Sequence, residues 1–93
     1  MDRNHPEYLT TLNRAVDDWT ARAEAHAKAA EAYRLAHANA FRASDGKNAD
    51  ARKADADAAT SAERLARELA EVARDAAYHR LIGIRGSAGE RQQ

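Results

Sequence analysis

With 93 residues the chain is long enough for one domain, and its 15 basic and 15 acidic side chains cancel. That neutral balance argues against a dedicated DNA binder, which carries a basic excess, and equally against an acidic DNA mimic. The absence of cysteine excludes disulfides, thiolate metal sites and thiol catalysis, and no apolar run approaches the roughly 18 residues of a membrane span.

Alanine is the most informative residue in the composition. It occupies 25 of the 93 positions, whereas Leu, Ile, Val and Phe together occupy only 11. Alanine, Arg, Glu and Leu all favour helices, so the sequence predicts long helices rather than a disordered chain. Few large apolar side chains remain to fill a core, and we expect a second copy of the chain to add to it.

The first helix is expected to begin at Pro6, because proline suits the first helical position and the residue before it avoids the helical conformation. No further Pro or Gly occurs before Gly46, which predicts an unbroken helix to about Ala43 or Ser44. Along it, a series of residues alternates in steps of three and four, the spacing of a seam between paired helices in a coiled coil. That series is Leu9, Leu12, Val16, Trp19, Ala23, His26, Ala30, Tyr33, His37 and Ala40.

A turn is predicted at residues 45–47. Asp45-Gly46 can leave the helical region because glycine accepts a positive φ without a Cβ clash, so we expect Gly46 in that conformation. Asn48 can then cap a second helix, with Asp50 in its first turn near the positive end of the helix dipole. The chain is therefore expected to fold back on itself as an antiparallel helical hairpin.

The second arm begins with residues 49–59, a stretch that favours helix but holds no large apolar residue. Thr60-Ser61-Ala62-Glu63 then has the form of a capping box, which predicts a new helix from Thr60 and a break near residues 59–61. One continuous helix from Asn48 to Ile82 is the alternative, and the sequence does not favour either.

The last helix is expected to end at Gly83 and Gly86, since glycine is the usual residue just beyond a helix. The fold class is then all-α, with a single hairpin domain over residues 1–84. Residues 85–93 are expected to form a flexible C-terminal tail.

Apolar residues occur on more than one face of each arm. Leu35 lies about 160° around the first helix from Trp19, so one seam cannot bury both. We therefore expect self-association through an interface built from the last helix and the alanine-rich half of the first. Its residues are expected to include Leu35, Leu65, Val72 and Tyr78. Two hairpins related by a twofold axis would form a dimer with the shape of a four-helix bundle.

No set of residues indicates catalysis, so the protein is expected not to be an enzyme. The sequence has neither a Ser/His/Asp signature nor a glycine-rich phosphate loop. His26 and His37 share a helix face but lie about 16 Å apart along the axis, too far for one zinc ion. We therefore expect no catalytic residue, no metal ligand and no cofactor.

Arginine side chains in the last arm suggest a basic surface that could contact nucleic acid or a protein partner. They are Arg67, Arg74, Arg80 and Arg85. Acidic residues interleave with them, which is typical of a solvated face of ion pairs. Trp19 and Tyr33 could stack on bases if they were exposed, but at seam spacing we expect both in the core.

Several short motifs follow one another between about Trp19 and Ile84. They are Ala38-Asn39-Ala40-Phe41, Asp45-Gly46, Arg52-Lys53-Ala54-Asp55-Ala56, Thr60-Ser61-Ala62-Glu63 and Arg74 to Leu81. In this order they resemble a group of short Ala/Glu/Arg-rich helical proteins encoded by tailed bacteriophages, notably those of high-GC Gram-positive hosts. The chain departs from that group at Gly83 and Gly86, where other members continue a Leu/Arg-rich final helix.

The resemblance implies a small phage accessory protein in the host cytoplasm, because members tend to be encoded near genes for recombination or single-strand DNA handling. It carries over no active-site residue. We expect a non-catalytic helical interaction protein whose partners are a second copy and a phage or host protein, with no membrane contact. Direct nucleic-acid binding through the arginine-bearing face is the alternative, and a structural part of the virion is a third.

Overall fold

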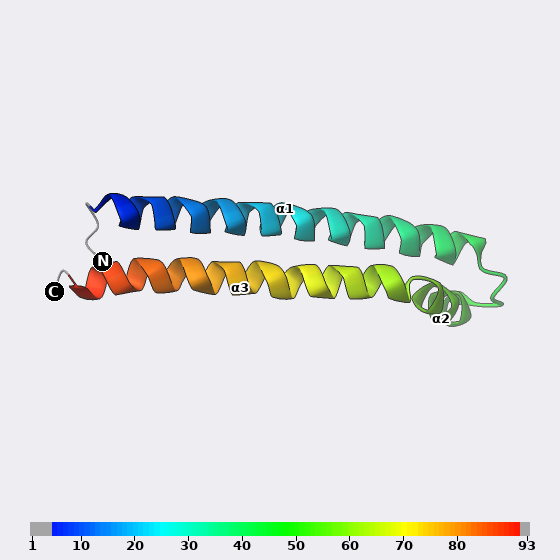
Figure 1. The fold of residues 1–93 in the computed structure, drawn as a ribbon. Coiled ribbons are helices and arrows are strands. Elements are labelled where there is room, and N and C mark those ends of the chain that lie inside the picture. The colour runs from blue at the N-terminus through cyan, green and yellow to red at the C-terminus, as the bar shows by residue number, and fades with distance from the viewer. Residues whose placement is uncertain (1–4, 92–93) are drawn as a thin grey trace.

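A computed structural model describes residues 5–91 as three helices: α1 (Pro6–Ala43), α2 (Ala49–Ala59) and α3 (Ser61–Arg91) (Figure 1). The two long helices, α1 and α3, lie side by side and run antiparallel, so the turn and α2 occupy one end (Figure 1). The molecule is a rod with extents of 64 × 19 × 14 Å. The prediction of an all-α helical hairpin is confirmed.

Capping interactions explain where α1 begins and ends. The side chain of His5 accepts a hydrogen bond from the backbone N–H of Glu7, and Pro6 follows as the first helical residue. At the other end, Ser44 turns to an extended conformation and its N–H donates to the carbonyl oxygen of Phe41. The predicted bounds of the first helix are therefore confirmed.

The turn contains a glycine for a different reason than the sequence suggested. Gly46 was expected at a positive φ, and this is wrong: no described residue, glycines included, adopts one. A Cβ on Gly46 would instead lie 2.8 Å from the backbone nitrogen of Arg52 and 3.0 Å from the carbonyl carbon of Ala51. Glycine is needed because the turn lies directly against the first turn of α2, which Asn48 caps by accepting a 2.8 Å hydrogen bond from Ala51.

The second arm is broken at Thr60, which settles the alternative that the sequence left open. α2 is seen nearly end-on in Figure 1 while α1 and α3 lie across the view, so α2 leaves the long axis of the hairpin. Thr60 is 3% exposed, and its hydroxyl donates a 2.7 Å hydrogen bond to the carbonyl oxygen of Ala56 in α2. The expected capping box is absent from the described contacts, because this hydroxyl bonds backward and Glu63 Oε2 is buried without a partner.

The prediction that Gly83 and Gly86 end the last helix is wrong, because α3 continues to Arg91. Leu81 is buried and Ile84 is half-buried, so the helix still packs on α1 at and beyond the first of these glycines. A glycine inside a helix costs only about 1 kcal/mol, which such packing can offset. Residues 85–91, expected to begin a tail, are thus helical, and residues 92–93 lie outside the described part of the chain.

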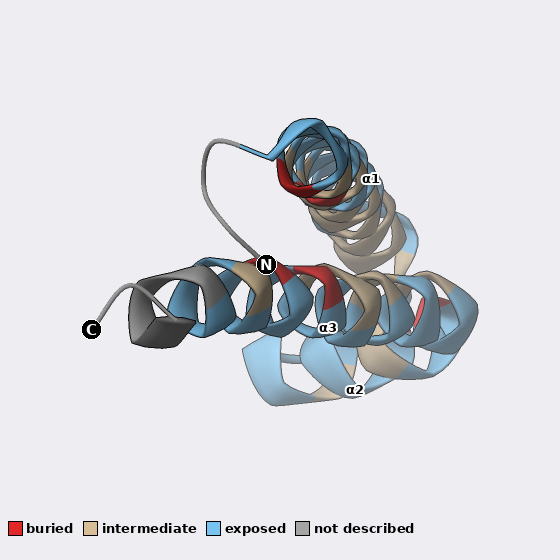
Figure 2. Cartoon of the chain, turned by 60° about the vertical axis from the view of Figure 1, so that its left-hand side comes forward, coloured by how far each residue is buried: buried red, intermediate tan, exposed pale blue. Residues whose placement is uncertain are grey.

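The core is a narrow seam where α1 and α3 face each other (Figure 2). Its buried members are Tyr8 and Ala15 of α1 and Ala77 and Leu81 of α3, with Ala56 buried at the break. The predicted seam is wrong near the open end of the hairpin, since Leu9 and Val16 are exposed. Tyr8 and Ala15 take their places because they follow the same steps of three and four, and a small side chain at residue 15 lets the helices approach closely.

Candidate functional site

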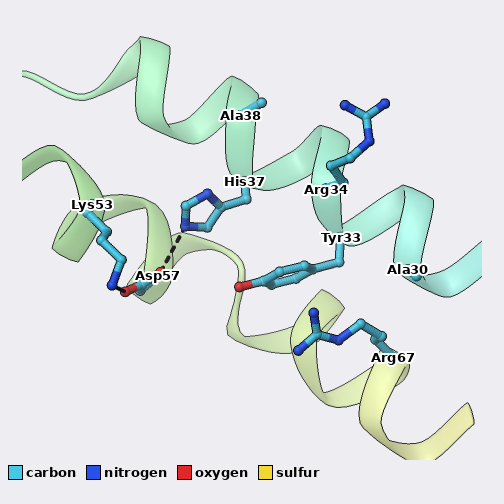
Figure 3. A pocket seen from close by; sticks show the side chains of 8 residues that line it. All are labelled: Ala30, Tyr33, Arg34, His37, Ala38, Lys53, Asp57 and Arg67. Atoms are coloured by element: carbon cyan, nitrogen blue, oxygen red, sulfur yellow. Dashed lines mark hydrogen bonds and ion pairs between the residues drawn. The ribbon is translucent and has the colours of Figure 1, made fainter. Parts of the chain in front are cut away.

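A groove of about 560 Å³ lies in the corner that α2 makes with the two long helices (Figure 3). α1 provides most of its lining, while α2 and α3 each close one side. The lining residues are Ala30, Tyr33, Arg34, His37, Ala38, Lys53, Asp57 and Arg67. The groove exists because the chain breaks at Thr60, which carries α2 out of line with α3.

One wall of the groove is a polar contact between α1 and α2. His37 Nε2 lies 2.8 Å from Asp57 Oδ1, and Lys53 Nζ lies 3.7 Å from the other carboxylate oxygen (Figure 3). The hydrogen bond with His37 holds the pKa of Asp57 below its usual value against the opposing effect of burial, with smaller contributions from Lys53, His37 and Arg64. This contact fixes α2 to the first helix.

The other wall joins α1 to α3 through an aromatic ring. The guanidinium of Arg67 lies over the Tyr33 ring, 4.5 Å from its centroid, and the rings of Tyr33 and His37 are 5.7 Å apart. The Arg34 guanidinium points away from Arg67 and Asp57 (Figure 3). It pairs with Glu31 at 2.6 Å. The charged side chains of the groove and His37 are therefore engaged with one another or with neighbours, an arrangement that suits holding three helices together.

Metal binding needs several ligands in one place. Within the described residues, no three His, Asp or Glu side chains come together to hold a metal ion. His26 instead lies 3.0 Å from Arg74 across the seam, and His37 contacts Asp57. Both histidines thus connect helices.

The four arginines of the predicted basic surface do not share one open face. Arg67 covers Tyr33, and Arg74 contacts His26 as well as Asp75 at 3.1 Å. Arg80 reaches Asp18 of α1 at 3.2 Å. Arg85 is exposed toward the open end of the hairpin. Arg67, Arg74 and Arg80 thus each contact a residue of α1. The four arginines do not form one basic surface.

The structure also separates the four residues of the predicted self-association set. Leu65 and Val72 lie on one face of α3, whereas Tyr78 lies beside Trp19 at the edge of the seam, with ring centroids 6.2 Å apart. Leu35 is on α1, nearly opposite the seam residue Tyr33 around the helix. A single flat contact cannot cover all four.

One residue that the predicted set omitted completes a continuous stripe. Leu69 lies one turn from Leu65 and from Val72, and all three are more than half exposed. With the exposed alanines at either end they form a series in steps of three, four, three and four, which we call the outer stripe. It consists of Ala62, Leu65, Leu69, Val72 and Ala76. It lies roughly 120° around α3 from the buried residues Ala77 and Leu81, so α1 does not cover it.

A second exposed apolar surface lies along the side of the hairpin, in the half nearer the open end. We define this end patch as Val16, Trp19, Tyr78 and Ile82. Trp19 and Tyr78 are in contact across the seam. Val16 and Ile82 are each one turn further toward the open end on their own helix, and both are exposed. The hairpin therefore presents apolar side chains on two separate sides.

These features define the chain as a two-arm helical hairpin with exposed apolar surfaces. No protein-family model matches it, and comparisons with curated proteins and with solved structures found no match. Across residues 5–91, none of the helices carries an apolar stretch long enough to cross a membrane.

Proposed function

We propose that this protein is a non-catalytic helical interaction protein. The observation that carries the proposal is the exposure of large apolar side chains on two sides of a hairpin whose own seam is thin. Val72 is 67% exposed and Leu69 is 61% exposed, although both have the spacing of a helix contact. Apolar surfaces of this kind usually serve association with another protein.

The outer stripe is proposed to serve self-association and the end patch to receive a different protein. The resemblance to short phage proteins supports a role as a phage accessory factor in the host cytoplasm, acting with DNA-processing or host proteins. Direct nucleic-acid binding is less favoured, because Arg67, Arg74 and Arg80 already pair within the hairpin. A virion component has no specific support among the described contacts.

A capture experiment tests the role in protein interaction. The tagged protein is incubated with nuclease-treated extract of infected host cells, and the retained proteins are identified by mass spectrometry. Ile82→Glu places a charge in the end patch, and Leu35→Glu places the same charge on the far face of α1. We expect a protein that handles DNA to be retained by the wild type and by Leu35→Glu, and lost with Ile82→Glu.

Direct nucleic-acid binding, the alternative function, predicts a different result. If no protein depends on Ile82, and the purified chain binds DNA with an affinity that falls steeply with salt, the protein is a nucleic-acid binder. Charge reversal at Arg85, which is exposed at the open end, should then weaken binding on all sequences alike.

A further inference from the structure

The hairpin exposes more surface than a compact monomer of its mass. Its accessible surface is 6691 Å² for a chain of 10.2 kDa. A typical folded monomer of that mass exposes about 5,300 Å², so the excess is roughly 1,400 Å². A standard interface takes about 800 Å² from each partner, so the excess is sufficient for a stable interface. The outer stripe is part of the surface that the hairpin leaves exposed.

We infer that the outer stripe pairs in parallel and in register with the outer stripe of a second copy. This rests on the proposed function and names the partner of that surface. The steps of three and four from Ala62 to Ala76 are those of the contact positions of a two-stranded coiled coil. A partner helix must present the same spacing, and a second copy does so by symmetry.

Charges beside the stripe select the parallel direction. Asp75 and Arg80 flank the stripe on opposite sides, five residues apart, the spacing at which flanking residues of two parallel helices form ion pairs. In a symmetric parallel pair, Asp75 of each copy meets Arg80 of the other, so the attraction occurs twice. Both side chains are more than half exposed in the single hairpin, where Asp75 pairs with Arg74 and Arg80 pairs with Asp18.

Charges beside the stripe also disfavour the antiparallel direction. In an antiparallel pair, the flank of the stripe that carries Glu68 and Asp75 in one copy lies alongside the same flank of the other copy, so acidic residues face acidic residues. Like charges at these positions oppose pairing. The two α3 helices therefore form the centre of a four-helix assembly, with an α1 helix on each outer side.

Oligomeric state tests whether the stripe is the interface. Light scattering coupled to gel filtration of the purified protein at micromolar concentration should give twice the monomer mass. Leu69→Glu should raise the dimer dissociation constant by roughly 100-fold or more, because the interface would bury two unpaired carboxylates. Leu35→Glu is the matched control, with Leu35 49% exposed on the other helix, and it should remain a dimer. Circular dichroism checks that both variants stay helical.

Single cysteines test direction, and the chain has no cysteine of its own to interfere. In a parallel pair, residue 62 meets its own copy and residue 76 meets its own copy. Ala62→Cys and Ala76→Cys should therefore each form disulfide-linked dimers under mild oxidation. In an antiparallel pair, neither variant would cross-link alone, and only a mixture of the two would.

The outcomes separate this inference from the proposed function. A wild-type monomer, a dimer unaffected by Leu69→Glu, or cross-linking only in the mixture would each overturn parallel pairing. A monomer that still captures a protein through Ile82 would leave the interaction role intact. A parallel dimer that captures nothing would support the pairing while counting against the proposed accessory role.

Discussion

At the scale of single residues, two glycines, one in the turn and one inside α3, should respond to alanine in opposite ways. A Cβ at Gly46 would press on backbone atoms of Ala51 and Arg52, which cannot move without shifting α2. Gly46→Ala should therefore lower the free energy of unfolding by about 1–3 kcal/mol. Gly83 lies inside α3 with nothing near its Cβ position, so Gly83→Ala should raise it by about 0.5–1 kcal/mol.

Urea unfolding followed by circular dichroism at the helical band measures both changes. The two variants control for each other, because they make the same substitution in different surroundings. Equal effects of the same sign would show that the close approach at Gly46 does not constrain the turn.

Trp19 is a seam residue of intermediate exposure rather than a fully buried one. It should therefore contribute less to the free energy of unfolding than a fully buried tryptophan. Its ring packs on Tyr78, which is itself 46% exposed. Trp19→Ala should cost roughly 2 kcal/mol, below the about 3–5 kcal/mol typical of a fully buried tryptophan. Tyr78→Ala in the wild-type background should shift Trp19 fluorescence to longer wavelength, whereas Tyr78→Phe should not. An unchanged spectrum in Tyr78→Ala would argue against the ring contact.

At the scale of helices, the contact of His37 with Asp57 holds α2 in place. It should make the free energy of unfolding depend on pH in the acid range. The hydrogen bond with His37 lowers the folded-state pKa of Asp57 below the usual value of an aspartate side chain. A lowered folded pKa gives a contribution that is complete above the unfolded pKa and is lost as pH falls through the folded pKa. Asp57→Asn should thus melt below the wild type at neutral pH, with the gap closing as pH falls below about 4.

The control for this prediction is Asp45→Asn, in the exposed turn. Thermal melts of the three proteins across the acid range supply the comparison. A gap between wild type and Asp57→Asn that stays constant down to strongly acid pH would show that ionisation of Asp57 does not hold α2.

The helices that could be predicted from sequence are those marked by local chemistry. Pro6 and Asn48 fix helix starts through backbone and capping effects that operate within a few residues. Where tertiary contacts decide, local patterns misled: α3 continues past Gly83 because Leu81 and Ile84 pack on α1. The spacing of apolar residues was equally consistent with a seam through Leu9 or through the neighbouring Tyr8, since both series have the same steps.

For the candidate surfaces too, features set by local helix geometry could be predicted from the sequence, whereas features set by tertiary contacts could not. Spacing alone was enough to show that Leu65 and Val72 belong to an apolar face too broad for one neighbouring helix, because it depends only on helix geometry. It could not show that Arg67, Arg74 and Arg80 turn to partners within the hairpin, since those partners lie far away in sequence. The groove beside α2 was also hidden, because its shape depends on the direction that the chain takes at Thr60.

At the scale of the whole molecule, the maximum dimension of the assembly should show whether two copies pair side by side or end to end. The hairpin has a radius of gyration of 20.1 Å and a longest extent of 64 Å, whereas a compact domain of this length would have a radius near 12 Å. Pairing along α3 places the two rods side by side. Small-angle scattering should therefore give twice the monomer mass with a maximum dimension only slightly above that of one hairpin, and Leu69→Glu should halve the mass while keeping that dimension. A maximum dimension close to twice the hairpin length would mean that the copies join end to end, and that the outer stripe is left to another protein.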